Sequence, residues 1–556
     1  MKKGKIILII LLALLILILP GAVYYKIQLY KLTYIYTYFS KPDEGYISLN
    51  QKKLDILKYE LSLDLYPEKK LLIAEAIITG KVLDENLNSI DLNFYDNFKI
   101  TKLTLNGEVA DYENVGTRLS VPFNSSSGYE FILEVNYAGT PKKAGLEGFV
   151  FGKRNGTSVV YNLSEPNYAS SWFPCNDIPF DKTILDISIT NDSSMVSVSN
   201  GVLVDVVTKG DRRTYKWRTE YPISTYLVSI YSSMYEYFYD EYVSLDGMDT
   251  MRVEYYVLPD KLEKAKVDFS THIQMLEVFA EMIGEYPFIK EKYGVAEFLW
   301  YAGAMEHQTI TGVSSNMIGG KMFFESTLVH ELAHQWWGNA VGPKSWKDIW
   351  LNEGFATYSE ALYYEAVSGA EALQSTMMSK YSSNFSGSLG EPGPFLFTRT
   401  IYDKGAWVLH MLRWEIGDSS FFSLLREYYE TYKYSNASIA DFKLICERVS
   451  GKNLDKFFEQ WVYGKGQIDI NYKTEVTEIN DSILVSIMIE QVQDKYAEFH
   501  FPIEVKLKFS DSQEKFYRYN IYSKDVVLEI PAGTVPESIE LDPNNWLLAS
   551  FNLANE

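Results

Sequence analysis

Two parts of the chain alternate hydrophobic and polar residues with a period of two. The first lies between about residues 53 and 237 and includes LKYELSLDLYPEKKLLIAEAIITGKVL, EFILEVNYAG and TILDISITN, separated by turn residues. The second begins after Gly466 and includes ILVSIMIEQV and FPIEVKLKF. This alternation is typical of strands that bury one face. It predicts an N-terminal antiparallel β domain over residues 51–237, without helices, and a smaller C-terminal β-sandwich domain over residues 466–556.

The region between them has the longer period of amphipathic helices. Helices are predicted at residues 260–284, 325–338, 352–368, 402–416, 419–433 and 439–450, and Ser438 or Asn436 would cap the last one. A strand-like run, YGVAEFLWYAGAMEHQTITGV, lies between the first two helices. The pattern therefore predicts a mixed domain over residues 238–465 and a multidomain α+β chain.

The N-terminus begins with an uncharged hydrophobic segment. Residues 6–25 carry no charge, and twenty helical residues are about 30 Å long, which matches a bilayer core. Three lysines precede the segment, so we expect a cytoplasmic tail and signal anchor at residues 1–25, a stalk at residues 26–50 and an extracytoplasmic body. The alternative is a cleaved signal peptide, but the run exceeds the usual 7–15 residue core and no A-x-A site follows.

Composition restricts the classes of partner. The chain has 556 residues, a formal net charge of -21 and a pI near 4.9. A nucleic-acid-binding protein needs a basic surface to neutralise phosphates, so this balance argues against nucleic acid. Cys175 and Cys446 are the only cysteines, so no disulfide framework is expected. Oligomeric state is not indicated.

Candidate metal ligands lie in the predicted helix ESTLVHELAHQWWGN. His330 and His334 are four residues apart, which places both imidazoles on one helical face, and Glu331 lies beside them. HExxH is the helix on which two histidines bind zinc while the glutamate acts as general base. Gly338 is expected to end the helix. The alternative is an amphipathic core helix with two hydrogen-bonded histidines.

A third ligand is required for tetrahedral zinc, and Glu353 is the candidate. It lies nineteen residues after His334, at the start of the next helical run, so a return helix would bring it to the metal. Glu360 follows two turns later on the same face and would accept the N–H of a ligand histidine. The prediction is one zinc per chain. With a third carboxylate present in a chain of only six histidines, the metal site is preferred over the core helix.

HELAHQWWGN and WLNEGFA resemble the aminopeptidase N and leukotriene hydrolase family of gluzincins, peptidase family M1. The resemblance implies a thermolysin-like zincin domain between two β domains. In GAMEH it implies an edge strand (Gly303, Ala304, Met305) followed by a glutamate, Glu306, that binds the substrate's α-amino group. YDKG implies that Tyr402 stabilises the oxyanion, and SEPNYASSWFPCND implies a second amine-binding acid at Glu165. His307 departs from the family's asparagine and is interpreted as structural, as are His272, His410 and His500.

Together these features predict a membrane-anchored zinc aminopeptidase acting on peptides with a free N-terminus. Two alternatives stay open: a thermolysin-type endopeptidase, if Glu306 and Glu165 do not reach the cleft, and an extracellular binding protein with a retired site. Epoxide hydrolysis, as in the leukotriene branch, is less favoured. A retired site has no physical reason to keep ligands, base and oxyanion donor together.

Overall fold

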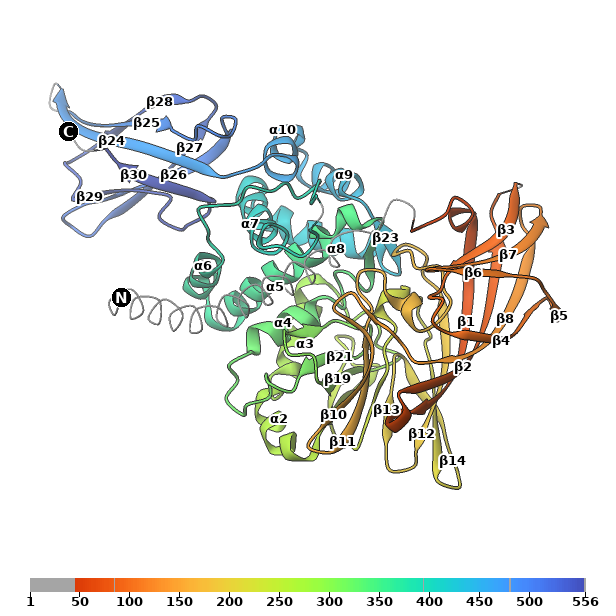
Figure 1. Ribbon diagram of the computed structural model, residues 1–556. Coiled ribbons are helices and arrows are strands. Elements are labelled where there is room, and N and C mark those ends of the chain that lie inside the picture. The colour runs from red at the N-terminus through yellow and green to blue at the C-terminus, as the bar shows by residue number, and fades with distance from the viewer. Residues whose placement is uncertain (1–45, 85, 394, 480–481, 555–556) are drawn as a thin grey trace, which may run out of the picture.

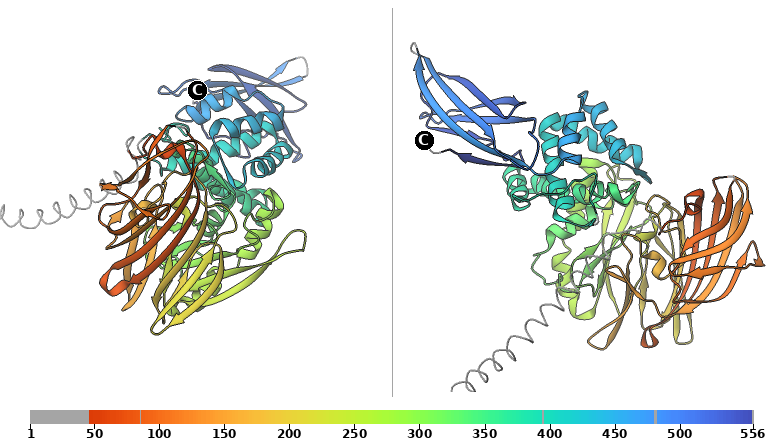
Figure 2. Two further views of the ribbon diagram at one scale, coloured as in Figure 1. Left: turned by 90° about the vertical axis from the view of Figure 1, so that its right-hand side faces the viewer. Right: turned by 45° about the horizontal axis from the view of Figure 1, so that its top comes forward.

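The computed structural model describes residues 46–554, apart from residues 85, 394, 480 and 481. Three regions follow one another, and Figures 1 and 2 show two β regions at opposite ends of a helical centre. Multidomain α+β architecture is thereby confirmed. No helix among the described residues is both long and hydrophobic enough to cross a bilayer. The predicted membrane segment at residues 6–25 and most of the predicted stalk lie outside the described residues.

The N-terminal region contains three sheets. The largest has the strand order β14-β15-β12-β1-β2-β8-β4-β5, a second has the order β13-β16-β11-β10-β9, and a third has the order β3-β7-β6. Their bounds are β1 (Leu54–Tyr66), β2 (Leu71–Val82), β3 (Leu87–Asn93), β4 (Lys99–Leu105), β5 (Glu108–Val109), β6 (Glu113–Val115), β7 (Arg118–Ser125), β8 (Glu130–Gly139), β9 (Lys143–Ala144), β10 (Glu147–Arg154), β11 (Thr157–Leu163), β12 (Ile184–Asp192), β13 (Val196–Val198), β14 (Val202–Lys209), β15 (Arg212–Arg218) and β16 (Tyr231–Ser233).

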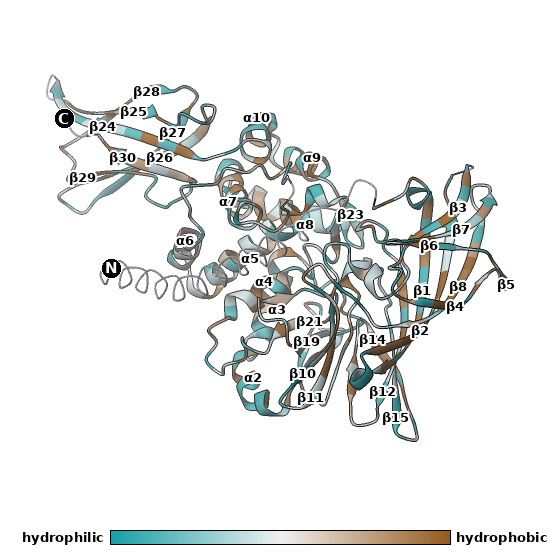
Figure 3. Ribbon diagram, viewed as in Figure 1, coloured by the Kyte–Doolittle hydropathy of each residue, from teal (hydrophilic) through white to brown (hydrophobic). Residues whose placement is uncertain are grey.

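One pairing in this region differs from the prediction of an antiparallel domain. Strands β1 and β12 pair in parallel, with Lys58 opposite Ile184, while the other pairs are antiparallel. More than a hundred residues separate these two strands in sequence, so the alternation that predicts each strand carries no information about their relative direction. Figure 3 shows hydrophobic and hydrophilic residues alternating along the strands.

The central region is a mixed five-stranded sheet with helices. Its order is β17-β18-β19-β21-β20, which leaves β20 at one edge. The strands are β17 (Glu236–Val243), β18 (Thr250–Val257), β19 (Tyr293–Phe298), β20 (Ala304–Met305) and β21 (Thr311–Ser314), and a small ladder joins β22 (Val341–Pro343) to β23 (Ser435–Ala437). The predicted domain boundary at residues 237 and 238 falls within β17, and the boundary at 465 and 466 falls shortly before β24.

The helices follow the predicted periodicity with several shifts. They are α2 (Leu262–Asp268), α3 (His272–Ile283), α4 (Glu325–Ala333), α5 (Trp350–Ser368), α6 (Ala370–Ser379), α7 (Gly405–Ile416), α8 (Asp418–Tyr432), α9 (Ile439–Ser450) and α10 (Asp455–Phe458). The predicted helix at 260–284 is divided in two, and α6 was not predicted. Ser438 caps α9, since its Oγ accepts the Asp441 N–H.

The C-terminal region is rich in β structure, as predicted. Four strands have the order β28-β25-β24-β30 and three have the order β27-β26-β29, and β24 pairs in parallel with β30. Their bounds are β24 (Ile468–Ile479), β25 (Ser482–Gln491), β26 (Phe501–Lys508), β27 (Glu514–Ile521), β28 (Asp525–Ala532), β29 (Ser538–Leu541) and β30 (Ala549–Leu553).

Candidate active site

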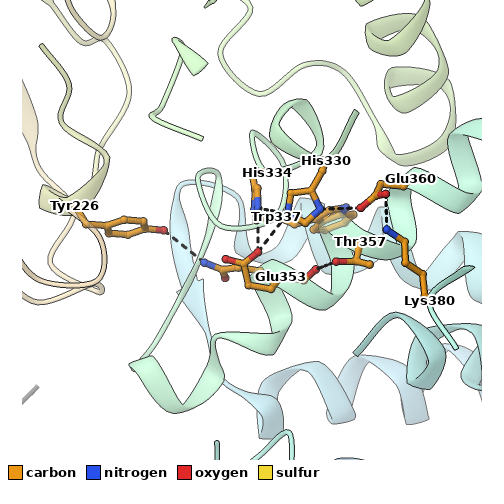
Figure 4. Close-up of polar contacts among 9 residues, drawn as sticks. Tyr226, His330, His334, Trp337, Glu353, Thr357, Glu360 and Lys380 are labelled. Carbon is orange, nitrogen blue, oxygen red and sulfur yellow. Dashed lines mark hydrogen bonds and ion pairs between the residues drawn. The ribbon is translucent and has the colours of Figure 1, made fainter. Parts of the chain in front are cut away.

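The predicted metal ligands meet between α4 and the first turn of α5. Nε2 of His330 and Nε2 of His334 are 3.1 Å apart, and Oε2 of Glu353 lies 3.3 Å from each of them. Zinc–ligand bonds of about 2.0–2.2 Å in a tetrahedron place neighbouring donor atoms roughly 3.3–3.5 Å apart. Three donors at this spacing fit one zinc ion. Figure 4 shows the two imidazoles and the carboxylate converging on one point.

The zinc-motif helix ends earlier than predicted. Its last residue is Ala333, and His334 follows with helical dihedrals of φ −58° and ψ −23°. Gly338, the predicted stop, instead lies in the following turn with φ +115°. The Trp337 ring contacts the ring of Phe355 in α5 at a tilt of 50°, with centroids 4.9 Å apart, which packs this turn against α5. Although the helix ends at Ala333, the helical dihedrals of His334 keep its side chain on the same face as that of His330. The turn after His334 packs against α5, the helix that supplies Glu353.

The nitrogen of each imidazole that faces away from the metal has a partner of its own. Nδ1 of His330 is 3.1 Å from Oε1 of Glu360, as the spacing predicts, and Nδ1 of His334 is 2.9 Å from the carbonyl of Trp337. Lys380 donates to the other oxygen of Glu360 at 2.7 Å. These contacts hold the proton on Nδ1, so that Nε2 is left to bind the metal (Figure 4).

Charge at the ligand cluster is arranged for a cation. Burial alone lowers the pKa of His330, but hydrogen bonds with Glu353 and Glu360 outweigh it and raise that pKa to about 10. Burial raises the pKa of Glu353, yet the two histidines outweigh it and bring that pKa to about 2. The three donors therefore stabilise positive charge between them, as a metal-cation site requires.

Two glycines explain how α5 and α7 approach each other beside the metal site. A Cβ on Gly354 would lie 3.0 Å from Cα of Gly405, and a Cβ on Gly405 would lie 2.8 Å from Cα of Gly354. Gly354 follows the ligand Glu353, and Gly405 ends the YDKG motif. Because Gly405 is three residues after Tyr402, this close contact places Tyr402 near the metal site. Neither glycine was identified from the sequence.

Tyr402 lies on a π-helical turn, Thr400–Lys404, just before α7. Its ring is nearly parallel to that of His330, with centroids 5.9 Å apart. Burial, together with the carboxylates of Glu353 and Glu165, raises the pKa of Tyr402 well above its usual value. The phenol therefore stays protonated and remains a hydrogen-bond donor beside the metal ligands.

A cavity of about 760 Å³ gathers the predicted site residues. Besides the three metal ligands, it is lined by Glu331, Tyr402, Glu306, Glu165, the β20 residues Ala304 and Met305, and Gly303 just before that strand. Glu360 is not part of its lining and lies behind His330. Burial raises the pKa of Glu331 to about 8. The structure thus brings together residues from both the N-terminal and the central regions at one cleft.

Glu306 and Glu165 form a buried pair of carboxylates next to the metal site. Glu306 directly follows edge strand β20, and Glu165 follows β11 by two residues. Only 4% of Glu306 and 7% of Glu165 is exposed, and Oε1 of each has no partner among the described residues. One carboxylate oxygen from each of Glu165, Glu306 and Glu353 lies within 4.8 Å of the others. Burial raises the pKa of both carboxyls, and nearby carboxylates raise it further, so either bound protons or a cation must compensate the charge of the pair.

The backbone of Glu306 is held by the turn that follows the zinc-motif helix. Nδ2 of Asn339 donates to the Glu306 carbonyl at 2.7 Å, and the backbone N–H of Asn339 donates to the carbonyl of His334 at 3.0 Å. Gln335 accepts the Thr309 N–H at 2.9 Å. These two residues were missed, although both belong to the quoted run HELAHQWWGN, because their partners are distant in sequence.

The N-terminal region contacts the same turn. Nζ of Lys182 donates to the carbonyls of Asn339 and Ala340 at 2.6 and 2.9 Å, and the Tyr226 hydroxyl donates to the Gly338 carbonyl at 3.4 Å. The region that carries Glu165 is therefore bonded to the turn that holds Glu306.

His307, the departure from the family pattern, lies in the protein interior. Its Nδ1 is 2.6 Å from the Tyr231 hydroxyl, and burial lowers its pKa to about 3, so the ring is neutral. Glu306 still lines the cleft beside it. The substitution therefore leaves the candidate amine-binding carboxylate at the site.

Comparison with known families covers both the N-terminal and central regions. Residues 55–227 match the peptidase M1 N-terminal domain, and residues 267–461 match the peptidase family M1 domain. Curated relatives include probable aminopeptidase 2 of Sulfurisphaera tokodaii, 26% identical over 77% of this chain and 56% of its own length. Leucyl aminopeptidase of Saccharolobus solfataricus is 25% identical over 66% of this chain and 48% of its own length. The chain spans about half the length of these relatives.

Solved structures agree with the sequence matches. The M1 zinc metallopeptidase from Deinococcus radiodurans is 25% identical, with a TM-score of 0.67 over 74% of this chain and 94% of its own. Aminopeptidase A of Legionella pneumophila, in complex with aspartic acid, has a TM-score of 0.80 over 93% of this chain and 61% of its own, and at 18% identity it supports the fold alone. The zinc named for the Deinococcus radiodurans metallopeptidase agrees with the donor set found here. With both domain matches and the zinc ligands in place, the chain belongs to peptidase family M1.

Proposed function

We propose that this protein is a zinc-dependent aminopeptidase that removes N-terminal residues from peptides. The observation that carries the proposal is the buried carboxylate pair, Glu306 and Glu165, beside the metal ligands. A free ammonium is the cation that this pair fits, because charge-assisted hydrogen bonds to carboxylates are strongest where water is excluded. An ammonium bound there places the first peptide bond of the substrate near the zinc ligands.

Each remaining site residue has a role in this reaction. Zinc held by His330, His334 and Glu353 would polarise the scissile carbonyl and lower the pKa of a bound water toward about 7. Glu331 accepts the proton of the attacking water and passes it to the leaving amine. Tyr402 donates a hydrogen bond to the oxygen on which negative charge develops.

The edge strand orients the peptide. Among the strands of the described residues, β20 pairs only with β21, which leaves its other edge available to hydrogen-bond an extended substrate backbone. Because Glu306 follows directly after β20, a peptide aligned on this edge directs its N-terminus toward the carboxylate pair.

The decisive assay compares amino-acid anilides with their N-acetylated analogues, with and without a chelator. We expect cleavage of the free-amine substrates only, and loss of that cleavage when zinc is removed. A thermolysin-type endopeptidase is the second candidate, and the free edge of β20 is compatible with it. Equal cleavage of acetylated and free substrates, or initial cutting at internal bonds of long peptides, would favour the endopeptidase. Zinc binding without cleavage of any peptide would favour the retired binding protein.

We also propose that residues 6–25 anchor the enzyme in a membrane with its catalytic body outside the cytoplasm. The support is the uncharged, bilayer-length segment and the lysines before it. Membrane fractionation of the full chain, with protease added to intact cells, tests both points. Recovery in the soluble fraction, with residues 1–25 present at the N-terminus, would contradict the anchor.

A further inference from the structure

We propose that the cleft selects peptides whose N-terminal side chain is apolar and rejects those that begin with aspartate or glutamate. This inference rests on the proposed aminopeptidase function and specifies its substrate class. It is carried by the residues next to the carboxylate pair and by the distribution of charge around the cavity.

Covalent geometry determines where the first side chain lies. Its Cβ is two bonds from the ammonium nitrogen, so the side chain must begin beside the groups that bind the ammonium. Leu163 precedes Glu165 by two residues, and Met305 directly precedes Glu306. Both line the cavity, and they are only 1% and 3% exposed. The part of the wall nearest the bound amine is therefore apolar.

Several other residues of the cavity lining are also apolar. Leu146, Met317 and Phe324 belong to the cavity lining, and Trp300 lies on the loop that leads to β20. Such a surface stabilises a large apolar side chain in proportion to the area that it removes from water. It contributes little to a side chain as small as that of alanine.

Charge around the cavity opposes an acidic side chain. Four glutamates line the cavity, and no lysine or arginine does so among the described residues. Lys380 is paired with Glu360, and Lys404 donates to the Gly464 carbonyl at 2.9 Å, so these two lysines are engaged outside the cavity. A carboxylate in the cavity would thus be desolvated without a partner.

The test uses anilides of glutamine and glutamate, which have the same shape and differ in charge. We expect kcat/KM for the glutamine substrate to exceed that for the glutamate substrate at least tenfold, and leucine to exceed alanine at least tenfold. As a measurement free of turnover, calorimetry on the zinc-loaded wild-type protein should give a Kd for the product amino acid glutamine at least tenfold below that for glutamate.

A change in the wall tests the charge argument directly. Asn316 lines the cavity and its side chain is exposed, so Asn316→Lys introduces a cation there without disturbing the core, and Asn316→Gln is its uncharged control. The lysine variant should reduce the glutamine-to-glutamate ratio severalfold relative to the glutamine variant.

Two results would overturn the inference: a wild-type ratio near one, or a ratio that Asn316→Lys does not change. Either result, obtained with a retained preference for free over acetylated amines, refutes the selectivity alone. Loss of that amine preference would instead refute the proposed aminopeptidase function.

Discussion

Glu360 should control zinc affinity through the orientation of His330. Its carboxylate lies 3.1 Å from Nδ1 of His330 and 2.7 Å from Nζ of Lys380. Glu360→Ala leaves a buried N–H without an acceptor and allows the ring to tilt. Removing such a partner of a metal-bound histidine typically costs about 10–100-fold in metal affinity or activity. That range corresponds to about 1.4–2.8 kcal/mol, which agrees with the ~1.5–3 kcal/mol of a hydrogen bond to a charged group.

Zinc dissociation constants, measured by competition with a chromogenic chelator, test this expectation. Glu360→Gln retains an oxygen that can accept the His330 N–H but removes the charge, so its affinity should lie between wild type and Glu360→Ala. Lys380→Met is the matched control, because it removes the other partner of Glu360 and leaves the contact with His330. It should change affinity less than either substitution of Glu360. Wild-type zinc affinity in Glu360→Ala would refute the reasoning.

Other substitutions separate binding from chemistry. His334→Ala should abolish stoichiometric zinc binding together with activity, as metal analysis of the purified variant would show. Glu331→Gln should keep its zinc while kcat falls by at least about 10²–10⁴-fold, the usual contribution of general base catalysis, and undiminished turnover would exclude Glu331 as the base. Glu306→Ala should lower kcat/KM for free-amine substrates tenfold or more, because a charge-assisted hydrogen bond is lost. It should also reduce the ratio of kcat/KM between free-amine and acetylated substrates. A ratio of kcat/KM between free-amine and acetylated substrates that is unchanged from wild type would argue against amine binding by Glu306.

Features that depend on local spacing could be predicted from the sequence. His330 and His334 are one helical turn apart, and Glu360 lies two turns after Glu353, so their relative directions follow from helix geometry. The prediction of Glu353 as the third ligand required only one further assumption, that the next helix packs back against the HExxH helix. The metal site and its hydrogen-bonded glutamate are therefore largely properties of two helices.

Features that depend on distant partners could not be predicted in the same way. Strand β1 pairs in parallel with β12, and Gly354 contacts Gly405. Each contact joins two segments that are far apart in sequence, and no periodic pattern in the sequence links them. Asn339 is a similar case, because its role is visible only once the Glu306 carbonyl lies 2.7 Å away. Glu306, Tyr402 and Glu165 were identified through the family resemblance and not through periodicity.

The division of the site between two regions bears on the difference between an aminopeptidase and an endopeptidase. An endopeptidase cleft must leave room for substrate residues on the N-terminal side of the cleaved bond, whereas under the proposed function Glu165 occupies that side. Glu165 belongs to the N-terminal region, while the zinc ligands and Glu306 belong to the central region. Lys182 bonds the first region to Asn339, and Asn339 bonds Glu306. Under the proposed function, the preference for a free N-terminus therefore depends on how the two regions pack, and the HExxH helix alone would serve either kind of peptidase.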